Sequence, residues 1–328
     1  MPKIGEITAI ILAAGKGTRM RSLKPKVMHE VCGATLVECV LDAVLGAGVS
    51  RVIIVVGDKK ELIVPTLRGK AVEIAEQCGQ LGTAHAVMAA RRFLPEGMGA
   101  VLILNGDAPL VKPQTLKRLV ALHAETDADV TLVTAQLDNP YGYGRISRDA
   151  CGSIRGIVEQ GEATEDELNI REINAGIYVF KTTSLFEGLD AIVPHNKKGE
   201  FYLTDIISIF YNNGRKIEGF VSENIAEILG INTQQELAIV NQIRREEILQ
   251  SFMNQGITIV NPSNTFIENH VVIGEGTIIY PFTYICKNVV IGKQCSIGPF
   301  AYIKADTKIG DDVEMRNSVN EEGRVFLK

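Results

Sequence analysis

The sequence contains no apolar run that approaches the roughly 20 residues needed for a membrane-spanning helix. Its first six residues lack the basic segment, apolar core and cleavage site of a signal peptide. It also lacks a basic excess: 34 lysines and arginines face 39 acidic residues, whereas a dedicated nucleic-acid-binding protein normally carries a basic surface. We therefore expect a cytoplasmic protein that binds neither membranes nor nucleic acids.

Cysteine and histidine are too dispersed to indicate a metal site. The six cysteines include no C-x-x-C pair, and the five histidines lack the spacing of metal ligands. Buried cysteine behaves as a small hydrophobe, so reduced and mostly structural thiols are the leading interpretation. A zinc site or a catalytic thiolate stays the alternative. No Ser/His/Asp or Cys/His arrangement for nucleophilic catalysis is visible.

Short β-branched runs alternate with amphipathic stretches over the first 130 residues, in a chain long enough for one large domain and a smaller one. The predicted strands are 7–12, 51–56, 72–76, 100–105 and 130–134. The predicted helices between them are 36–47, 83–92 and 114–125. Apolar strands separated by helices predict a parallel sheet covered on both faces, with ligands at the carboxyl ends of its strands.

The next hundred residues are less regular. We expect an inserted hairpin from strands 144–147 and 153–158, followed by a strand at 176–180. A polar stretch without proline, 233–254, predicts a long helix that connects two domains.

From Thr265 onward the sequence has a period of six. Isoleucine occupies every sixth position from Ile267 to Ile309, and Met315 continues the series through nine uninterrupted hexapeptides that end near Ser318. Such a period predicts a β-helix of triangular coils, in which each side contributes one inward isoleucine. We expect this module to serve stacking and oligomerisation.

The stretch LAAGKGTRM, residues 12–20, follows the first predicted strand and carries two glycines. Glycine-rich loops in this position usually bind phosphate. The sequence does not match the phosphate-binding loop of kinases and ATPases, because Lys16 precedes Gly17. It does not match the dinucleotide-binding fingerprint either, because Met20 stands where the third glycine of that pattern belongs. The loop therefore indicates a different kind of phosphate chemistry.

Further motifs follow this loop. Gly82 and Thr83 enter a predicted helix, so free backbone N–H groups there could bind a base or a phosphate. Asp107 comes just after an apolar strand, where a carboxylate can hold Mg²⁺. In chain order the motifs are LKPKVMHEVCG, QCGQLGTAHAV, LILNGDAPL, NPYGYGRI, GIVEQ, REINAGIYVF, GEFYLTDII and LGINT.

This succession resembles the sugar-phosphate nucleotidyltransferases, and most closely the bacterial N-acetylglucosamine-1-phosphate uridyltransferases. The resemblance covers residues 7–255 closely, and 256–316 resemble the first part of that family's C-terminal β-helix. It implies an α/β fold, in which a Rossmann-like nucleotidyltransferase domain with a mixed, mostly parallel sheet precedes a short left-handed parallel β-helix. The implied limits are 1–232 for the first domain, 233–255 for a connecting helix and 256–328 for the truncated β-helix.

The resemblance also implies roles for matching residues. The nucleotide-binding positions would be Leu12, Ala13, Ala14, Gly15, Gln77, Gly82, Thr83, Asn105 and Gly106, with Gln80 as an alternative to Gln77. The catalytic cations would be Arg19, at the departing phosphates, and Lys26, at the phosphates that remain in the product. The Mg²⁺ ligands would be Asp107 and Asn232, and the sugar-binding residues Gly144, Glu159 and Asn174.

The implied reaction joins UTP and N-acetylglucosamine 1-phosphate into UDP-N-acetylglucosamine. Because the attacking phosphate is already ionised, two cations, one magnesium and a loop of N–H groups suffice without a side-chain nucleophile. Two features depart from the family pattern. Asn105 stands where relatives can carry an aromatic residue, and EQGEAT replaces a more common histidine-containing version after the sugar-binding glutamate. Another sugar 1-phosphate, another nucleotide, or a non-catalytic regulatory relative are therefore the alternatives.

The resemblance further implies a homotrimer assembled through the β-helix. In the family, later coils carry an acetyltransferase that uses a histidine base. The only histidine in this repeat is His270, in its first coil, so we expect no acetyltransferase activity from this chain.

Overall fold

The computed structural model describes residues 7–57, 59–94, 99–194, 196, 199–316 and 325–326. The chain divides into two units, one formed by residues 1–29 and 36–232 and the other by 30–35 and 233–328. The domain limits expected from the sequence stay a proposal. In the structure, residues 30–35 group with the C-terminal residues and not with their neighbours in the sequence. Within the described residues, no helix combines the length and the apolar character that crossing a membrane requires.

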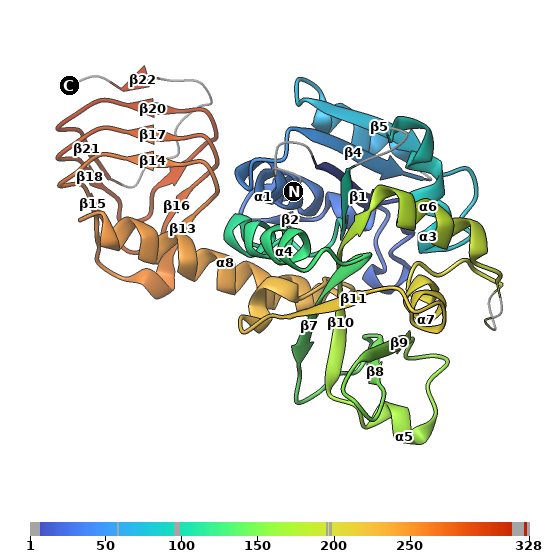
Figure 1. The fold of residues 1–328 in the computed structure, drawn as a ribbon. Helices are drawn as coiled ribbons and strands as arrows, with labels where there is room; N and C mark the ends of the chain where they lie inside the picture. Colours follow the sequence, from blue (N-terminus) through green and yellow to red (C-terminus); the bar gives the residue numbers. More distant parts are fainter. Residues whose placement is uncertain are drawn as a thin grey trace. The chain divides into compact units, whose positions relative to one another are not determined.

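A mixed sheet forms the centre of the first unit (Figure 1). Its strand order is β11-β7-β10-β6-β1-β4-β5. β1 pairs in parallel with β4 and β6, whereas β10 runs antiparallel to β6 and β7. The strands are β1 (Thr8–Ala13), β4 (Arg51–Val56), β5 (Val72–Glu76), β6 (Ala100–Asn105), β7 (Val130–Gln136), β10 (Glu172–Lys181) and β11 (Ile217–Val221). The predicted mixed, mostly parallel sheet is confirmed.

The inserted hairpin is also present, as β8 (Arg145–Arg148) and β9 (Ile154–Val158), and it joins the sheet where Arg145 pairs with Ile173 of β10. β10 begins earlier than the predicted strand 176–180. Its register with β7 shifts between Asn174 and Tyr178, where Gly176 adopts a φ of +71°. This irregularity interrupts the strand pattern in the sequence, which is why the first residues of β10 were missed.

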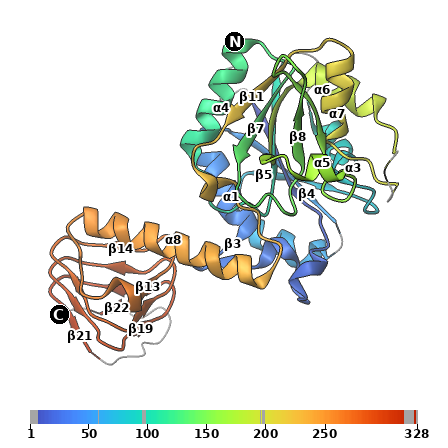
Figure 2. The same cartoon turned by 90° about the horizontal axis from the view of Figure 1, so that it is seen from below.

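Helices cover both faces of this sheet (Figure 2). α1 (Leu36–Gly46) and α4 (Pro113–Thr126) pack their apolar residues on one face, together with Ile11 of β1. α3 (Thr83–Ala90), α6 (Thr182–Ala191) and α7 (Asp205–Asn212) pack on the other, together with Ile10. The alternation of Ile10 and Ile11 between two cores follows from the two-residue period of a strand. The short helices are α2 (Lys60–Ile63) and α5 (Glu165–Leu168), with single 3₁₀ turns at Thr18–Met20, Lys26–Met28, Val64–Leu67, Arg91–Phe93 and Ile225–Ile228.

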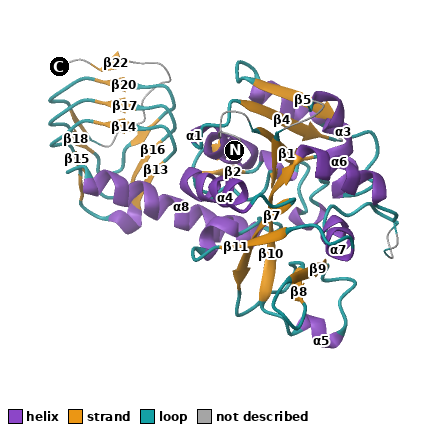
Figure 3. Cartoon of the chain, viewed as in Figure 1, coloured by secondary structure: helices purple, strands orange, loops and turns teal. Residues whose placement is uncertain are grey.

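The C-terminal part of the second unit begins with the predicted long helix, α8 (Gln234–Asn254), which is capped by Thr233 and Glu236. Short strands then alternate with turns (Figure 3). They form three parallel sheets, with orders β12-β15-β18-β21, β13-β16-β19 and β14-β17-β20-β22. The strands are β12 (Thr258–Ile259), β13 (Thr265–Ile267), β14 (Val272–Ile273), β15 (Ile278–Ile279), β16 (Thr283–Ile285), β17 (Val290–Ile291), β18 (Ser296–Ile297), β19 (Tyr302–Ile303), β20 (Lys308–Ile309), β21 (Glu314–Met315) and β22 (Val325–Phe326).

The six-residue period produces this three-sided β-helix. Ile267 pairs with Ile285, which pairs with Ile303, so three hexapeptides make one coil. The isoleucines of the period and Met315 are all buried in one core. From β13 to β21, each corner turns at a residue with positive φ, and most of these are not glycine: His270, Gly276, Phe282, Asn288, Gln294, Phe300, Asp306 and Asp312. The residues between β21 and β22 lie outside those that the structure describes.

A small hairpin, β2 (Glu30–Val31) and β3 (Ala34–Thr35), belongs to the second unit. The buried Asn269 side chain donates hydrogen bonds to the carbonyl oxygens of Val31, at 2.8 Å, and Cys32, at 2.6 Å. Asn241 of α8 accepts the Cys32 N–H at 2.9 Å. None of the six cysteines, all of which lie in the described residues, forms a disulfide, and burial raises the pKa of Cys32 to about 11, which keeps this thiol protonated and structural.

Candidate nucleotide-binding and active site

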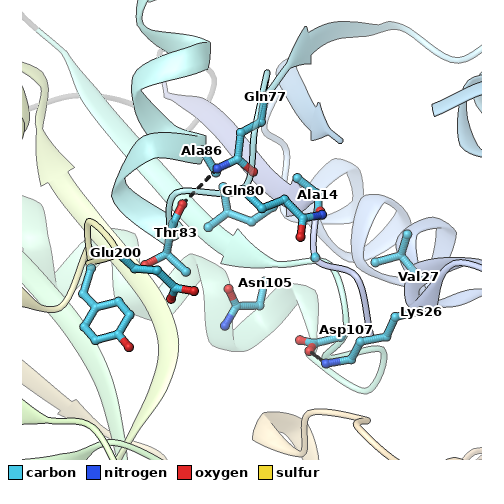
Figure 4. A pocket seen from close by; sticks show the side chains of 14 residues that line it. Ala14, Lys26, Val27, Gln77, Gln80, Thr83, Ala86, Asn105, Asp107 and Glu200 are labelled. Atoms are coloured by element: carbon cyan, nitrogen blue, oxygen red, sulfur yellow. Dashed lines mark hydrogen bonds and ion pairs between the residues drawn. The ribbon is translucent and has the colours of Figure 1, made fainter. Parts of the chain in front are cut away.

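A cavity of about 260 Å³ opens at the carboxyl ends of β1 and β6 (Figure 4). Nine of the residues that the sequence predicted line it: Leu12, Ala14, Gly15, Lys26, Gln77, Gly82, Thr83, Asn105 and Asp107. Val27, Gln80, Ala86, Glu200 and Tyr202 complete the lining. Residues from five separate stretches of the sequence therefore meet at the edge of the sheet where a parallel fold is expected to bind its ligand.

Strand pairing brings the glycine-rich loop next to Asp107. Leu12 of β1 pairs in register with Asn105 of β6, and the Gly106 N–H donates to the Leu12 carbonyl oxygen at 2.9 Å. A Cβ atom on Gly106 would stand 3.0 Å from that oxygen, so a side chain there would force the two strand ends slightly apart. Ala13 and Gly106 do not line the cavity, and Gly106 already donates its N–H within the sheet.

Beside the cavity, four predicted residues form one charged cluster. The Lys26 ammonium makes an ion pair with the Asp107 carboxylate and donates to Asn232 Oδ1 at 2.7 Å. The Arg19 guanidinium donates to the same Asn232 oxygen at 2.8 Å. The Ile231 N–H donates to the Asp107 carbonyl oxygen at 3.0 Å, which holds the segment that carries Asn232 against the turn after β6.

The oxygen atoms in this cluster suit a hard divalent cation. Asp107 Oδ2 and Asn232 Oδ1 both contact the Lys26 ammonium nitrogen, so they already converge on one cationic centre. One carboxylate and one amide oxygen match the small share of ligands that a protein usually gives Mg²⁺, with water and substrate phosphates supplying the others. No group of three or more His, Cys, Asp or Glu side chains gathers as a metal cage in the part of the chain that the structure describes.

Two glutamines lie in the loop before α3, and both line the cavity. Gln77 is buried and donates to the Gly82 carbonyl oxygen at 3.0 Å, while Gln80 donates to the Ala14 carbonyl oxygen at 2.9 Å. Gln77 thus fixes its own loop, whereas Gln80 ties this loop to the glycine-rich one. The sequence left the choice between them open, and the structure brings both to the cavity.

The segment around Phe201 forms a further wall of the cavity. Its N–H donates to the Leu81 carbonyl oxygen at 2.7 Å, and its carbonyl oxygen accepts the Ala84 N–H at 2.9 Å. The Leu203 N–H donates to the Thr83 hydroxyl at 2.9 Å. This pairing places Glu200 and Tyr202 in the lining. The predicted site does not include these two residues, although both lie in the motif GEFYLTDII.

The three predicted sugar-binding residues gather beside the cavity rather than in its lining. The Asn174 N–H donates to the Gly144 carbonyl oxygen at 2.9 Å, and a Cβ atom on Gly144 would stand 3.6 Å from the Glu159 carboxylate. Glu159 accepts a hydrogen bond from the Thr204 hydroxyl at 3.0 Å. Glu159 also lines an adjoining cavity of about 370 Å³, and Tyr202 lines both cavities.

Tyr202 stands at the boundary of the two cavities in an acidic environment. Burial, followed by the charges of Glu200, Glu159, Glu162 and Asp205, raises the pKa of its hydroxyl to about 12. The hydroxyl therefore stays protonated at neutral pH and can donate a hydrogen bond to a ligand.

Comparison with known proteins agrees with this geometry. Residues 9–168 match the MobA-like NTP transferase domain, and residues 264–305 and 288–320 match the bacterial transferase hexapeptide of six repeats. The bifunctional protein GlmU of Heliobacterium modesticaldum is 43% identical over 97% of this chain and 69% of its own length. That of Acetivibrio thermocellus is 44% identical over 95% of this chain and 68% of its own length.

This chain belongs to the GlmU family. The GlmU of Pelotomaculum thermopropionicum, 43% identical over 85% of this chain, is matched over only 61% of its own length. The chain thus spans about three fifths to two thirds of the length of the GlmU proteins it resembles. A solved structure of UDP-glucose pyrophosphorylase complexed with UDP-glucose shares the fold, with a TM-score of 0.61 at 17% identity over 75% of this chain and 100% of that chain.

Gly82 provides a direct test of the cavity wall. Its φ is +106°, and a Cβ atom there would overlap the Phe201 carbonyl oxygen, a backbone atom that cannot move aside cheaply. Gly79 in the same loop has a φ of +81°, with no atom within 4 Å of its Cβ position. We predict that Gly82→Ala destabilises the protein by about 1–3 kcal/mol more than Gly79→Ala, which thermal unfolding of the two variants measures. Equal melting temperatures would show that Phe201 does not pack on Gly82.

Proposed function

We propose that this chain transfers the uridylyl group of UTP to N-acetyl-α-D-glucosamine 1-phosphate, which yields UDP-N-acetylglucosamine and pyrophosphate. The observation that carries the proposal is the cluster of Arg19, Lys26, Asp107 and Asn232 beside the glycine-rich loop. It combines two cationic side chains with two oxygens suited to a divalent cation, beside a cavity of about 260 Å³. Membership of the GlmU family supports the choice of nucleotide and sugar.

The reaction needs no side-chain nucleophile. A phosphate oxygen of the sugar 1-phosphate forms a bond to the α-phosphorus of UTP, and the bond from that phosphorus to the oxygen bridging the α- and β-phosphates breaks. Pyrophosphate leaves with the bonding electrons, and no proton has to be abstracted because the attacking oxygen is already ionised. Alignment of two anions and compensation of their charge are therefore the protein's main tasks.

In this mechanism each part of the cavity has one task. The backbone of Leu12, Ala14 and Gly15 and the end of β6 at Asn105 approach the nucleotide, while Ala13 and Gly106, which do not line the cavity, support the paired strand ends. Gln77 or Gln80, with Gly82 and Thr83, reads the uracil edge. Arg19 neutralises the departing pyrophosphate, while Lys26 holds the phosphates that stay in the product.

Asp107 and Asn232 would hold Mg²⁺, because their oxygens converge on a single cationic position. When bound, the metal supplies positive charge that compensates the substrate phosphates. Glu159, Asn174 and the backbone of Gly144 would then bind the hydroxyl and acetamido groups of the sugar. Tyr202 joins them as a hydrogen-bond donor between the two cavities.

We also propose that the β-helix assembles the chain into a homotrimer. Phe282 and Phe300 stack at 5.1 Å between ring centroids, yet 54% and 61% of their surfaces are exposed. Apolar groups exposed on a sheet-rich module are commonly covered by another subunit.

We expect sedimentation equilibrium to give the molar mass of three chains, and the mass of a single chain at micromolar concentration would contradict the trimer. The absence of acetyltransferase activity stays a prediction.

The proposed substrates are tested by a matrix of four nucleoside triphosphates against several sugar 1-phosphates, with Mg²⁺ and a pyrophosphate-release assay. We expect the highest kcat/KM for UTP with N-acetylglucosamine 1-phosphate. A higher value with another pair would assign the chain to that sugar or nucleotide, which the Asn105 departure leaves as the alternative. No release with any pair would favour a non-catalytic relative.

Arg19 is the most informative position for the mechanism. We predict that Arg19→Ala lowers kcat by about 10²–10³-fold, as removal of a preorganised charge-stabilising donor does. Folding should be unaffected because Arg19 is exposed and its hydrogen bond to Asn232 lies at the surface. Arg68→Ala is the matched control, since Arg68 is exposed and does not line the cavity. Equal turnover of the two variants would remove Arg19 from the mechanism.

A further inference from the structure

The charged cluster supplies its own cation. The Lys26 ammonium contacts both Asp107 Oδ2 and Asn232 Oδ1 (Figure 4 shows its contact with Asp107). Its side chain is 12% exposed and that of Asp107 is 21% exposed, so water screens the pair only in part. These are the same two oxygens that the proposed function gives to the metal.

We propose that Lys26 occupies the cation position of this site in the free protein, so that a divalent metal binds there only as the ammonium leaves. The inference rests on the metal ligands named in the proposed function. One carboxylate supplies a single negative charge, which Lys26 already neutralises. A divalent cation that entered beside the ammonium would meet a repelling charge at a few ångström and would have to compete for both oxygens.

The geometry of Lys26 allows such an exchange. Its stem is held at the base, since the Gly17 backbone packs so closely on it that a Cβ atom at Gly17 would collide with the Lys26 stem. Beyond that point the chain has several rotatable bonds, and an ammonium is a point charge that can change partners. The phosphates of a bound nucleotide offer it a new anionic partner beside the same loop.

Metal and nucleotide should therefore bind cooperatively through this one side chain. The nucleotide draws Lys26 away from Asp107 and Asn232, which frees both oxygens for the metal. By linkage, a metal bound at these oxygens leaves the ammonium available to phosphate and raises nucleotide affinity by the same factor. Without nucleotide, the apparent metal affinity equals the intrinsic affinity multiplied by the fraction of molecules in which Lys26 does not hold the site.

The test measures Mn²⁺ binding to the nucleotide-free protein by electron paramagnetic resonance of the free ion. Lys26→Met removes the charge but keeps a side chain of similar length, and we expect it to bind Mn²⁺ at least about tenfold more tightly than the wild type. Lys16→Met is the matched control, since it removes the same charge from the neighbouring glycine-rich loop at an exposed residue that does not line the cavity. Its affinity should stay within twofold of the wild type.

Three further variants make the result specific. Lys26→Arg keeps the charge and should leave Mn²⁺ binding as weak as in the wild type. Asn232→Ala added to Lys26→Met should abolish the gain, because it removes one of the two oxygens. Should Lys26→Met fail to fold, as judged by circular dichroism, Lys26→Gln replaces it with the same expected gain.

Equal Mn²⁺ affinity in the wild type and a folded, uncharged Lys26 variant would overturn the inference. The proposed function would survive that result, because pyrophosphate release by the wild type is measured independently. No Mn²⁺ binding by any folded variant would overturn both the inference and the assignment of Asp107 and Asn232 to the metal.

Discussion

Parallel pairing of β1 with β6 is the constraint on which the candidate site depends. Leu12 and Asn105 pair in register, so the two strands end at the same level and their following loops lie side by side. The glycine-rich loop thereby meets the turn that carries Asp107, and the hydrogen bond from Ile231 to the Asp107 backbone adds Asn232. A one-residue slip between the strands would turn every side chain to the opposite face and separate these groups.

Charge compensation links this geometry to the proposed chemistry. The carboxylate of Asp107 is balanced by the Lys26 ammonium, and the Asn232 oxygen accepts hydrogen bonds from both Lys26 and Arg19. A nucleoside triphosphate would bring several negative charges into this cluster. Its phosphates would then be stronger partners for Lys26 and Arg19 than the oxygens of Asp107 and Asn232 are. The two cations of this cluster can therefore balance the Asp107 carboxylate when no nucleotide is bound and the phosphates when one is.

Local patterns in the sequence predicted most of the fold, because a buried strand or a six-residue coil leaves its period in a few neighbouring residues. The strands that carry the cavity and the isoleucine core of the β-helix were predicted for this reason. Long-range hydrogen bonds leave no such period. The grouping of residues 30–35 with the C-terminal unit depends on Asn241 and Asn269, and the place of Glu200 and Tyr202 in the cavity depends on the pairing around Phe201. The contact of Lys26 with Asp107 likewise appears only in three dimensions.

Isotope tracing tests the central claim, attack at the α-phosphorus, most directly. N-acetylglucosamine 1-phosphate labelled with ¹⁸O in its phosphate is incubated with UTP, Mg²⁺ and the protein, and the products are followed by ³¹P nuclear magnetic resonance. We expect every labelled oxygen to remain in the UDP-sugar while the released pyrophosphate carries none. Release of UDP, or labelled oxygen in pyrophosphate, would contradict uridylyl transfer at this site.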